Sequence, residues 1–76
     1  MEYVVVSFPA ARKVRIDGQD AGFTNDTLMV ERGHHVFDLG APQNYQPASV
    51  QRIVQSTTSI GPLIINDFRP WEVTYE

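Results

Sequence analysis

Apolar and polar residues alternate along most of this 76-residue chain, and that period of two most constrains its fold. The run from Lys13 to Asp17 alternates strictly, and Phe37 shares one face with Leu39 in a second run. Successive side chains of a β-strand point to opposite sides of the sheet, so this period is typical of half-buried strands. No segment has the apolar spacing of an amphipathic helix of about three turns. The sequence therefore predicts a fold built from strands.

Turn-forming residues interrupt the alternation about every ten residues, a rhythm that is typical of a small sandwich or barrel. Two glycines and Asp17 mark the first turn, because glycine adopts positive φ and aspartate bonds the backbone that follows it. The turn regions lie at residues 17–22, 24–26, 32–33, 41–47 and 56–62. In residues 49–55 the apolar residues Val50, Ile53 and Val54 also fit helical spacing, but the run is short and β-branched, which favours a strand.

We therefore predict a single domain over residues 1–76 with an all-β fold, a small antiparallel two-layer sandwich of immunoglobulin-like type with about seven strands. The strands are expected at residues 3–8, 13–17, 27–31, 34–39, 48–55, 62–68 and 71–75. The expected core consists of Val14, Ile16, Leu28, Val30, Phe37, Leu39, Val50, Leu63 and Ile65.

Composition excludes several classes of protein. A chain of 76 residues is too short for a two-domain enzyme, and the absence of Cys excludes disulfides, thiolate metal sites and a Cys nucleophile. A net charge of −3 argues against nucleic acid as the main partner. The apolar runs are too short to insert into a membrane, and the start of the chain lacks the pattern of a signal peptide, so the expected location is cytoplasmic.

An ordered series of short motifs runs from Arg12 to Phe68. The motifs are Val14-x-Ile16-Asp17-Gly18, Gly22-x-Thr24, Leu28-x-Val30, Gly33-x-His35-x-Phe37-x-Leu39, Tyr45-x-Pro47 and a closing apolar strand through Leu63 and Ile65. This series resembles the PEGA domain family over residues 12–68, with extra terminal strands at residues 1–8 and 69–76. The resemblance implies an immunoglobulin-like sandwich without enzymatic activity, found in bacterial and archaeal envelope or signalling proteins. An association with the cell envelope is implied by the resemblance only.

The two histidines are expected to have structural roles. His34 and His35 are neighbours, so a strand directs them to opposite faces and they are poorly placed to bind one metal ion. We expect His35 to be partly buried with a local hydrogen bond, and His34 to face solvent.

The remaining candidates for chemistry also have simpler explanations. Asp17, Asp20 and Asp26 suggest calcium, but their spacing does not fit an EF-hand and turn formation accounts for them. Arg12, Lys13 and Arg15 form the one basic cluster, in which Lys13 and Arg15 share the outer face of a strand. A solvated strand face is favoured there over a site for a small anionic partner. There is no nucleophile motif and no glycine-rich phosphate loop. We therefore predict no enzyme, no cofactor, and no catalytic, cofactor-binding or metal-binding residue.

Two predicted strands are apolar on both faces, which a single core does not explain. These strands contain residues 4–6 and 63–65, and the terminal residues 71–76 add an amphipathic strand pattern. Apolar surface left outside a core commonly marks an interface. The candidate interface residues are Val5, Ile64, Trp71, Val73 and Tyr75.

These residues lead to two hypotheses for the function. The first is a non-catalytic interaction module that associates with itself, as a homodimer, or with a protein partner through its terminal strands. The alternative is a carbohydrate- or cell-wall-binding module. In that case Tyr45, Trp71 and Tyr75 would be the aromatic platforms on which sugar rings stack.

Overall fold

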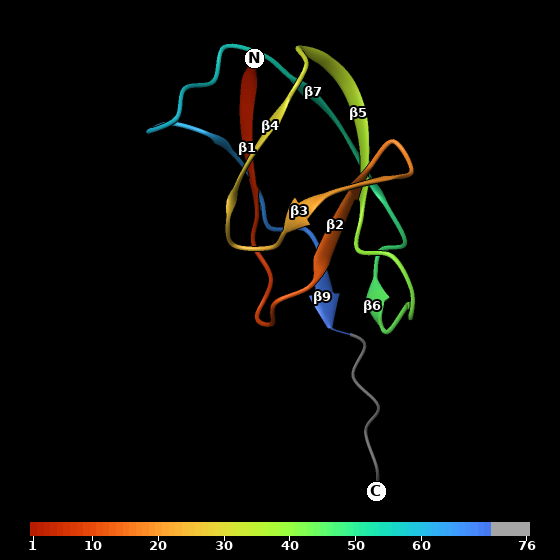
Figure 1. The fold of residues 1–76 in the computed structure, drawn as a ribbon. Coiled ribbons are helices and arrows are strands. Elements are labelled where there is room, and N and C mark those ends of the chain that lie inside the picture. Colours follow the sequence, from red (N-terminus) through yellow and green to blue (C-terminus); the bar gives the residue numbers. More distant parts are fainter. Residues whose placement is uncertain (71–76) are drawn as a thin grey trace, which may run out of the picture.

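Two β-sheets face each other across a shared apolar core in the computed structural model, which describes residues 1–70 (Figure 1). The strands of the described residues are β1 (Glu2–Val6), β2 (Lys13–Ile16), β3 (Gln19–Phe23), β4 (Thr27–Val30), β5 (Gly33–Asp38), β6 (Tyr45–Gln46), β7 (Val50–Val54), β8 (Leu63–Ile65) and β9 (Arg69–Pro70). The predicted all-β sandwich is confirmed. Within residues 1–70 no helix is long and apolar enough to cross a membrane.

The first sheet has three strands in the order β4-β1-β8. Its central strand, β1, pairs antiparallel with β4 and parallel with β8. The parallel pair differs from the purely antiparallel arrangement expected from the sequence. Parallel neighbours need a long crossover connection, and here the chain between β1 and β8 forms the whole opposite sheet as well as β4.

The second sheet has four antiparallel strands in the order β3-β2-β5-β7. The short strands β6 and β9 form a separate antiparallel pair at the end of the sandwich where the described chain finishes (Figure 1). Along one edge, Arg52 of β7 donates to the carboxylate of Asp67, with 2.6 Å between Nη2 and Oδ2. Because Asp67 follows β8, this ion pair links the two sheets.

Strand β3 corrects the prediction that residues 17–22 form only a turn. The turn is confined to Asp17 and Gly18, whose φ angles of 54° and 83° fit a two-residue type I′ hairpin loop. Ile16 then pairs with Gln19 as the chain reverses. Apart from the exposed Phe23, the residues of β3 are polar or small because it is an edge strand that buries little, so it lacks the alternation by which the other strands were predicted.

The core agrees closely with the prediction. Eight of the nine expected residues are buried, and Leu63 is only partly buried because it begins the edge strand β8. The core also contains six residues outside the predicted list: Val4, Val6, Phe8, Tyr45, Val54 and Phe68. In β1 the buried Val4 and Val6 alternate with the half-buried Tyr3 and Val5, so this strand directs apolar residues to both faces.

The strand boundaries differ from the prediction by one to a few residues. The largest difference is at β8, expected at 62–68 but ending at Ile65. The short strands β6 and β9 were not predicted. The strand expected at 71–75 lies outside the described residues.

Candidate functional site

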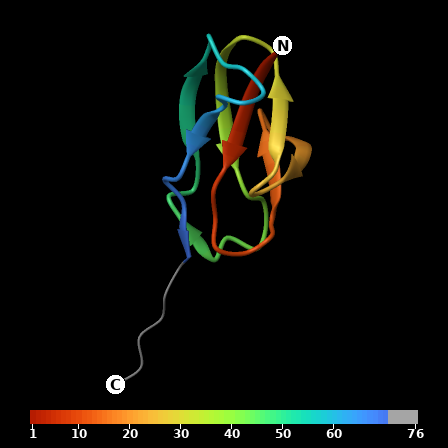
Figure 2. The ribbon, with the colours of Figure 1, turned by 90° about the vertical axis from the view of Figure 1, so that its left-hand side faces the viewer.

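The outer face of the three-stranded sheet consists of Tyr3, Val5, Thr27, Met29 and Ile64, which we call the docking face. Each of these residues alternates with a core residue of its strand, so its side chain points away from the sandwich. The register places Tyr3 opposite Met29, and it places Val5 between Thr27 and Ile64. Figure 2 views this sheet from outside, with β1 between β4 and β8.

None of the five residues of the docking face carries a charge. Met29 is 63% exposed and Ile64 is 50% exposed, while Tyr3 and Val5 are half-buried. Large apolar side chains that adjoin on one surface are typical of interfaces. The structure thus places the predicted interface residues Val5 and Ile64 side by side. The other three, Trp71, Val73 and Tyr75, lie outside the described residues.

A loop projects beyond one end of the docking face. This overhanging loop, residues 56–61, extends past the three-stranded sheet in Figure 1 and lies in front of its upper end in Figure 2. Its residue Ile60 is 96% exposed. Neither Ile60 nor Met29 was predicted from the sequence as an interface residue. The alternation in residues 27–31 could have identified Met29, since it directs Met29 to the face of the strand opposite to that of the buried Leu28 and Val30.

Hydrogen bonds hold the overhanging loop in place. The amide of Tyr3 donates to Thr57 Oγ1 over 2.7 Å, and the amide of Thr57 donates to Glu2 Oε1 over 2.8 Å. The hydroxyl of Thr57 also donates to this carboxylate, and together the two bonds lower the pKa of Glu2 below its ordinary value. Thr58 and Gly61 exchange backbone hydrogen bonds across the tip. The loop therefore presents Ile60 in a defined position.

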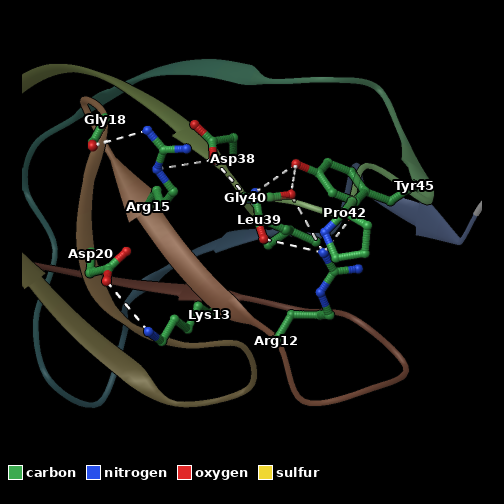
Figure 3. A network of polar contacts seen from close by, with 10 residues as sticks. All are labelled: Arg12, Lys13, Arg15, Gly18, Asp20, Asp38, Leu39, Gly40, Pro42 and Tyr45. Carbon is green, nitrogen blue, oxygen red and sulfur yellow. Dashed lines mark hydrogen bonds and ion pairs between the residues drawn. The ribbon is translucent and has the colours of Figure 1, made fainter.

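The outer face of the four-stranded sheet combines paired charges with the exposed apolar side chains of Phe23 and Ile53. Lys13 Nζ lies 3.5 Å from Asp20 Oδ2, and Arg15 Nε lies 3.8 Å from Asp38 Oδ1 (Figure 3). Arg15 also donates to the carbonyl of Gly18. These cations lie on a solvated strand face as expected, and each is paired with a carboxylate of a neighbouring strand. This face is therefore unlike the docking face.

Arg12, in contrast, holds the loop that follows β5. Its guanidinium donates to the carbonyls of Leu39 and Pro42, over 3.3 and 2.8 Å, and lies 5.1 Å from the centre of the Tyr45 ring (Figure 3). It also donates to the side chain of Asn44. These bonds occupy the guanidinium with the protein's own acceptors, so Arg12 has a structural role.

Tyr45 is not an exposed aromatic platform, which corrects the prediction that it stacks on a sugar ring. Tyr45 is only 2% exposed, because Arg12 covers its ring and the ring of Phe68 packs edge-on, with 5.7 Å between the two ring centres. The hydroxyl donates to the Gly40 carbonyl over 3.0 Å and accepts from the Leu39 amide over 3.2 Å. The other predicted platforms, Trp71 and Tyr75, lie outside the described residues, so no observation favours carbohydrate binding.

The two histidines have the structural contacts that were expected. His35 Nδ1 lies 2.6 Å from Asp17 Oδ2, and its Nε2 lies 2.6 Å from the Glu31 carbonyl oxygen. The hydrogen bond with Asp17 raises the pKa of His35, and the same bond lowers the pKa of Asp17. Because both ring nitrogens are engaged, His35 is poorly placed to serve as a base for a substrate. The exposed His34 is within 3.2 Å of Gln51.

A hollow of about 370 Å³ lies where the described chain finishes. It is lined by Ser7, Phe8, Pro9, Asn66, Phe68, Arg69 and Pro70. Its only charged group, Arg69, donates to the carbonyls of Asn66 and Phe68. The lining contains no acid–base pair, and residues 1–70 contain no group of three or more His, Cys, Asp or Glu side chains that could hold a metal ion.

No family model matches the chain, and neither a curated protein nor a solved structure has significant similarity to it. The resemblance of residues 12–68 to the PEGA family therefore stays a prediction, as does the cytoplasmic location.

Proposed function

We propose that this chain is a non-catalytic interaction module that binds a protein, either a second copy of itself or a different chain, through its docking face. The observation that carries the proposal is the uncharged row formed by Tyr3, Val5, Met29 and Ile64 on the outside of the three-stranded sheet. In a small sandwich each sheet normally has one face in the core and one face exposed to solvent. Here the outer face of the four-stranded sheet carries paired charges as well as the exposed Phe23 and Ile53, whereas the docking face carries adjoining side chains without any charge.

Burying these exposed residues against a partner would stabilise a complex without any catalytic step. Removing apolar surface from water contributes about 25 cal/mol for each Å², and this contribution needs no catalytic group. Among the titratable side chains of the described residues, His35, Asp17 and Glu2 are bonded within the fold. The apolar docking face and these bonded titratable groups all lie within residues 1–70.

Site-specific photo-crosslinking tests this proposal. Benzoylphenylalanine replaces Met29 in one variant and Ile53 in a control variant of the full chain, which is then irradiated in the cells that produce it. Ile53 is 64% exposed, a value close to that of Met29, but it lies on the outer face of the opposite sheet beside His34. We expect one protein adduct from position 29, identified by mass spectrometry, and no corresponding adduct from position 53.

A second substitution shows whether the adduct depends on the docking face. Adding Ile64→Asp to the Met29 variant is expected to abolish the adduct, because a carboxylate in the centre of an apolar contact must be desolvated. Adducts of equal yield from positions 29 and 53, or an adduct that survives Ile64→Asp, would overturn the proposal. So would the absence of any adduct from position 29.

A further inference from the structure

We propose that the protein bound to the docking face is a second copy of this chain, related by a two-fold axis, with the overhanging loop of each copy packed against the other. This inference rests on the proposed function and specifies the partner. It depends on three features of the described residues: the charge of the face, its size, and the loop beside it.

The charge distribution favours a second copy on this surface. The chain has a net charge of −3, so two copies repel each other weakly at long range. In a two-fold interface the same patch occurs on both sides, and a carboxylate within it would approach its own equivalent. The docking face has no charged residue, so two copies can approach through it without placing like charges together. The opposite outer face, with Asp20 and Asp38, lacks this property.

The size of the docking face explains why the loop is needed. Three strands cover a width of about 14 Å, and the five residues of the longest strand, β1, extend about 17 Å, so the flat area is at most about 240 Å². A stable interface needs about 800 Å² on each partner. The docking face alone is therefore too small, and a partner must also cover surface that projects beyond it. The overhanging loop projects in front of one end of this sheet (Figure 2).

A second copy supplies what this enlarged surface requires. Each chain carries both a flat apolar face and, at one end of it, the exposed side chain of Ile60. Under a two-fold axis both loops become part of one interface, so the contact of Ile60 is made twice. A different partner would have to provide its own projecting apolar group. The hydrogen bonds of Thr57 and Thr58 hold the loop before binding, which reduces the conformational entropy lost on association.

Sedimentation velocity of the full 76-residue chain over a range of micromolar concentrations tests the inference. We expect the mass to rise with concentration from 8.6 kDa towards twice that value. Ile60→Ser should weaken the dimer at least about 100-fold, because burial of two isoleucine side chains is lost. Ile53→Ser is the matched control, since Ile53 is an exposed isoleucine of the opposite sheet, and it should leave the dissociation constant unchanged. Far-ultraviolet circular dichroism verifies that each variant is folded.

The outcomes separate this inference from the proposed function. A chain that stays at 8.6 kDa at all concentrations, while position 29 forms an adduct with a different protein, overturns the second copy and retains the docking face. A dimer that is weakened equally by Ile60→Ser and Ile53→Ser overturns the role of the loop. A dimer that is insensitive to Ile64→Asp and Met29→Asp overturns both proposals. A dimer weakened by Ile60→Ser and by either docking-face variant, but not by Ile53→Ser, confirms the inference.

Discussion

The imidazole of His35 bridges the carboxylate of Asp17 and the carbonyl oxygen of Glu31, with 2.6 Å between the paired atoms on each side. Both partners are acceptors. A neutral imidazole has one N–H donor, whereas an imidazolium has two. The geometry therefore favours the protonated ring, in agreement with the raised pKa of His35 and the lowered pKa of Asp17. The bridge ties the β2–β3 turn and the residue after β4 to β5.

The first prediction is a fall in stability at alkaline pH. Because folding raises the pKa of His35, its contribution is complete below the unfolded value of about 6.5 and is lost as pH rises through the folded pKa. Asp17 affects stability at the acidic end of the pH range. Its lowered pKa makes its contribution present above about 3.9, and that contribution is lost as pH falls through the folded pKa. Urea unfolding between pH 3 and 9 measures both effects.

Two variants assign the alkaline part of this profile. His35→Gln is expected to flatten the decrease in the free energy of unfolding above about pH 6.5, because the group that titrates in the folded state is removed. His34→Gln is the control, since the side chain of exposed His34 forms a hydrogen bond with Gln51 and none with Asp17 or Glu31. A decrease of the same size in the His35→Gln variant would contradict the prediction.

The second prediction concerns the hydroxyl of Tyr45. Tyr45→Phe keeps the ring between Arg12 and Phe68 but leaves the amide of Leu39 without its acceptor. An unsatisfied buried donor costs about 1–3 kcal/mol. For a domain of this size, each kcal/mol lowers Tm by about 4–8 °C. Calorimetry measures the shift, and Tyr3→Phe, which removes the hydroxyl from a tyrosine of the docking face, should change Tm by less than half as much.

The third prediction concerns the contact between β3 and β4. Gly22 has a φ of 146°, and a Cβ added there would lie 2.5 Å from Leu28 Cδ2. Gly22→Ala therefore adds both backbone strain and overpacking, each costing about 1–3 kcal/mol. Gly33→Ala is a suitable comparison, because Gly33 has a φ of 135° and its added Cβ would meet no atom within 4 Å. We expect Gly22→Ala to be the more destabilising in urea unfolding, and equal effects would show that Leu28 moves aside freely.

The fourth prediction concerns the planar guanidinium of Arg12. Arg12→Lys keeps the positive charge but loses the geometry that reaches both Leu39 and Pro42. The segment after β5 should then open more often, with amide hydrogen exchange about 10-fold faster at Leu39 and no change at Val4 in β1. Lys13→Arg, one residue along and on the solvated face, should leave both exchange rates unaltered.

The alternation of residues predicts strands well only where one face is buried. It was sufficient for β2, β4 and β5, whose inward residues Val14, Leu28 and Phe37 are all in the core. It failed for β3, because this edge strand buries almost no side chain and its one large apolar residue, Phe23, is half exposed. The Asp17-Gly18 pair was a usable signal there, since it is typical of a two-residue hairpin loop and requires a strand to begin at Gln19.

The candidate site was predicted only in part, for a related reason. Val5 and Ile64 were selected because their strands are apolar on both faces, and the register places them directly opposite each other. Ile60 was missed because a lone apolar residue in a turn has no periodicity that would distinguish it. Tyr45 was misassigned as a platform because sequence alone does not reveal that Arg12 and Phe68 cover its ring.

The parallel pairing of β1 with β8 has a consequence for how the chain reaches its final form. Val4 to Val6 pair with Leu63 to Ile65, so β1 leaves the ribosome before β8 does and lacks one neighbour until the strands between them and β8 itself have been synthesised. Closing so large a loop makes the pairing slow, and until then one edge of an apolar strand is open to other nascent chains. The chain is therefore most prone to aggregate during synthesis before β8 has paired with β1.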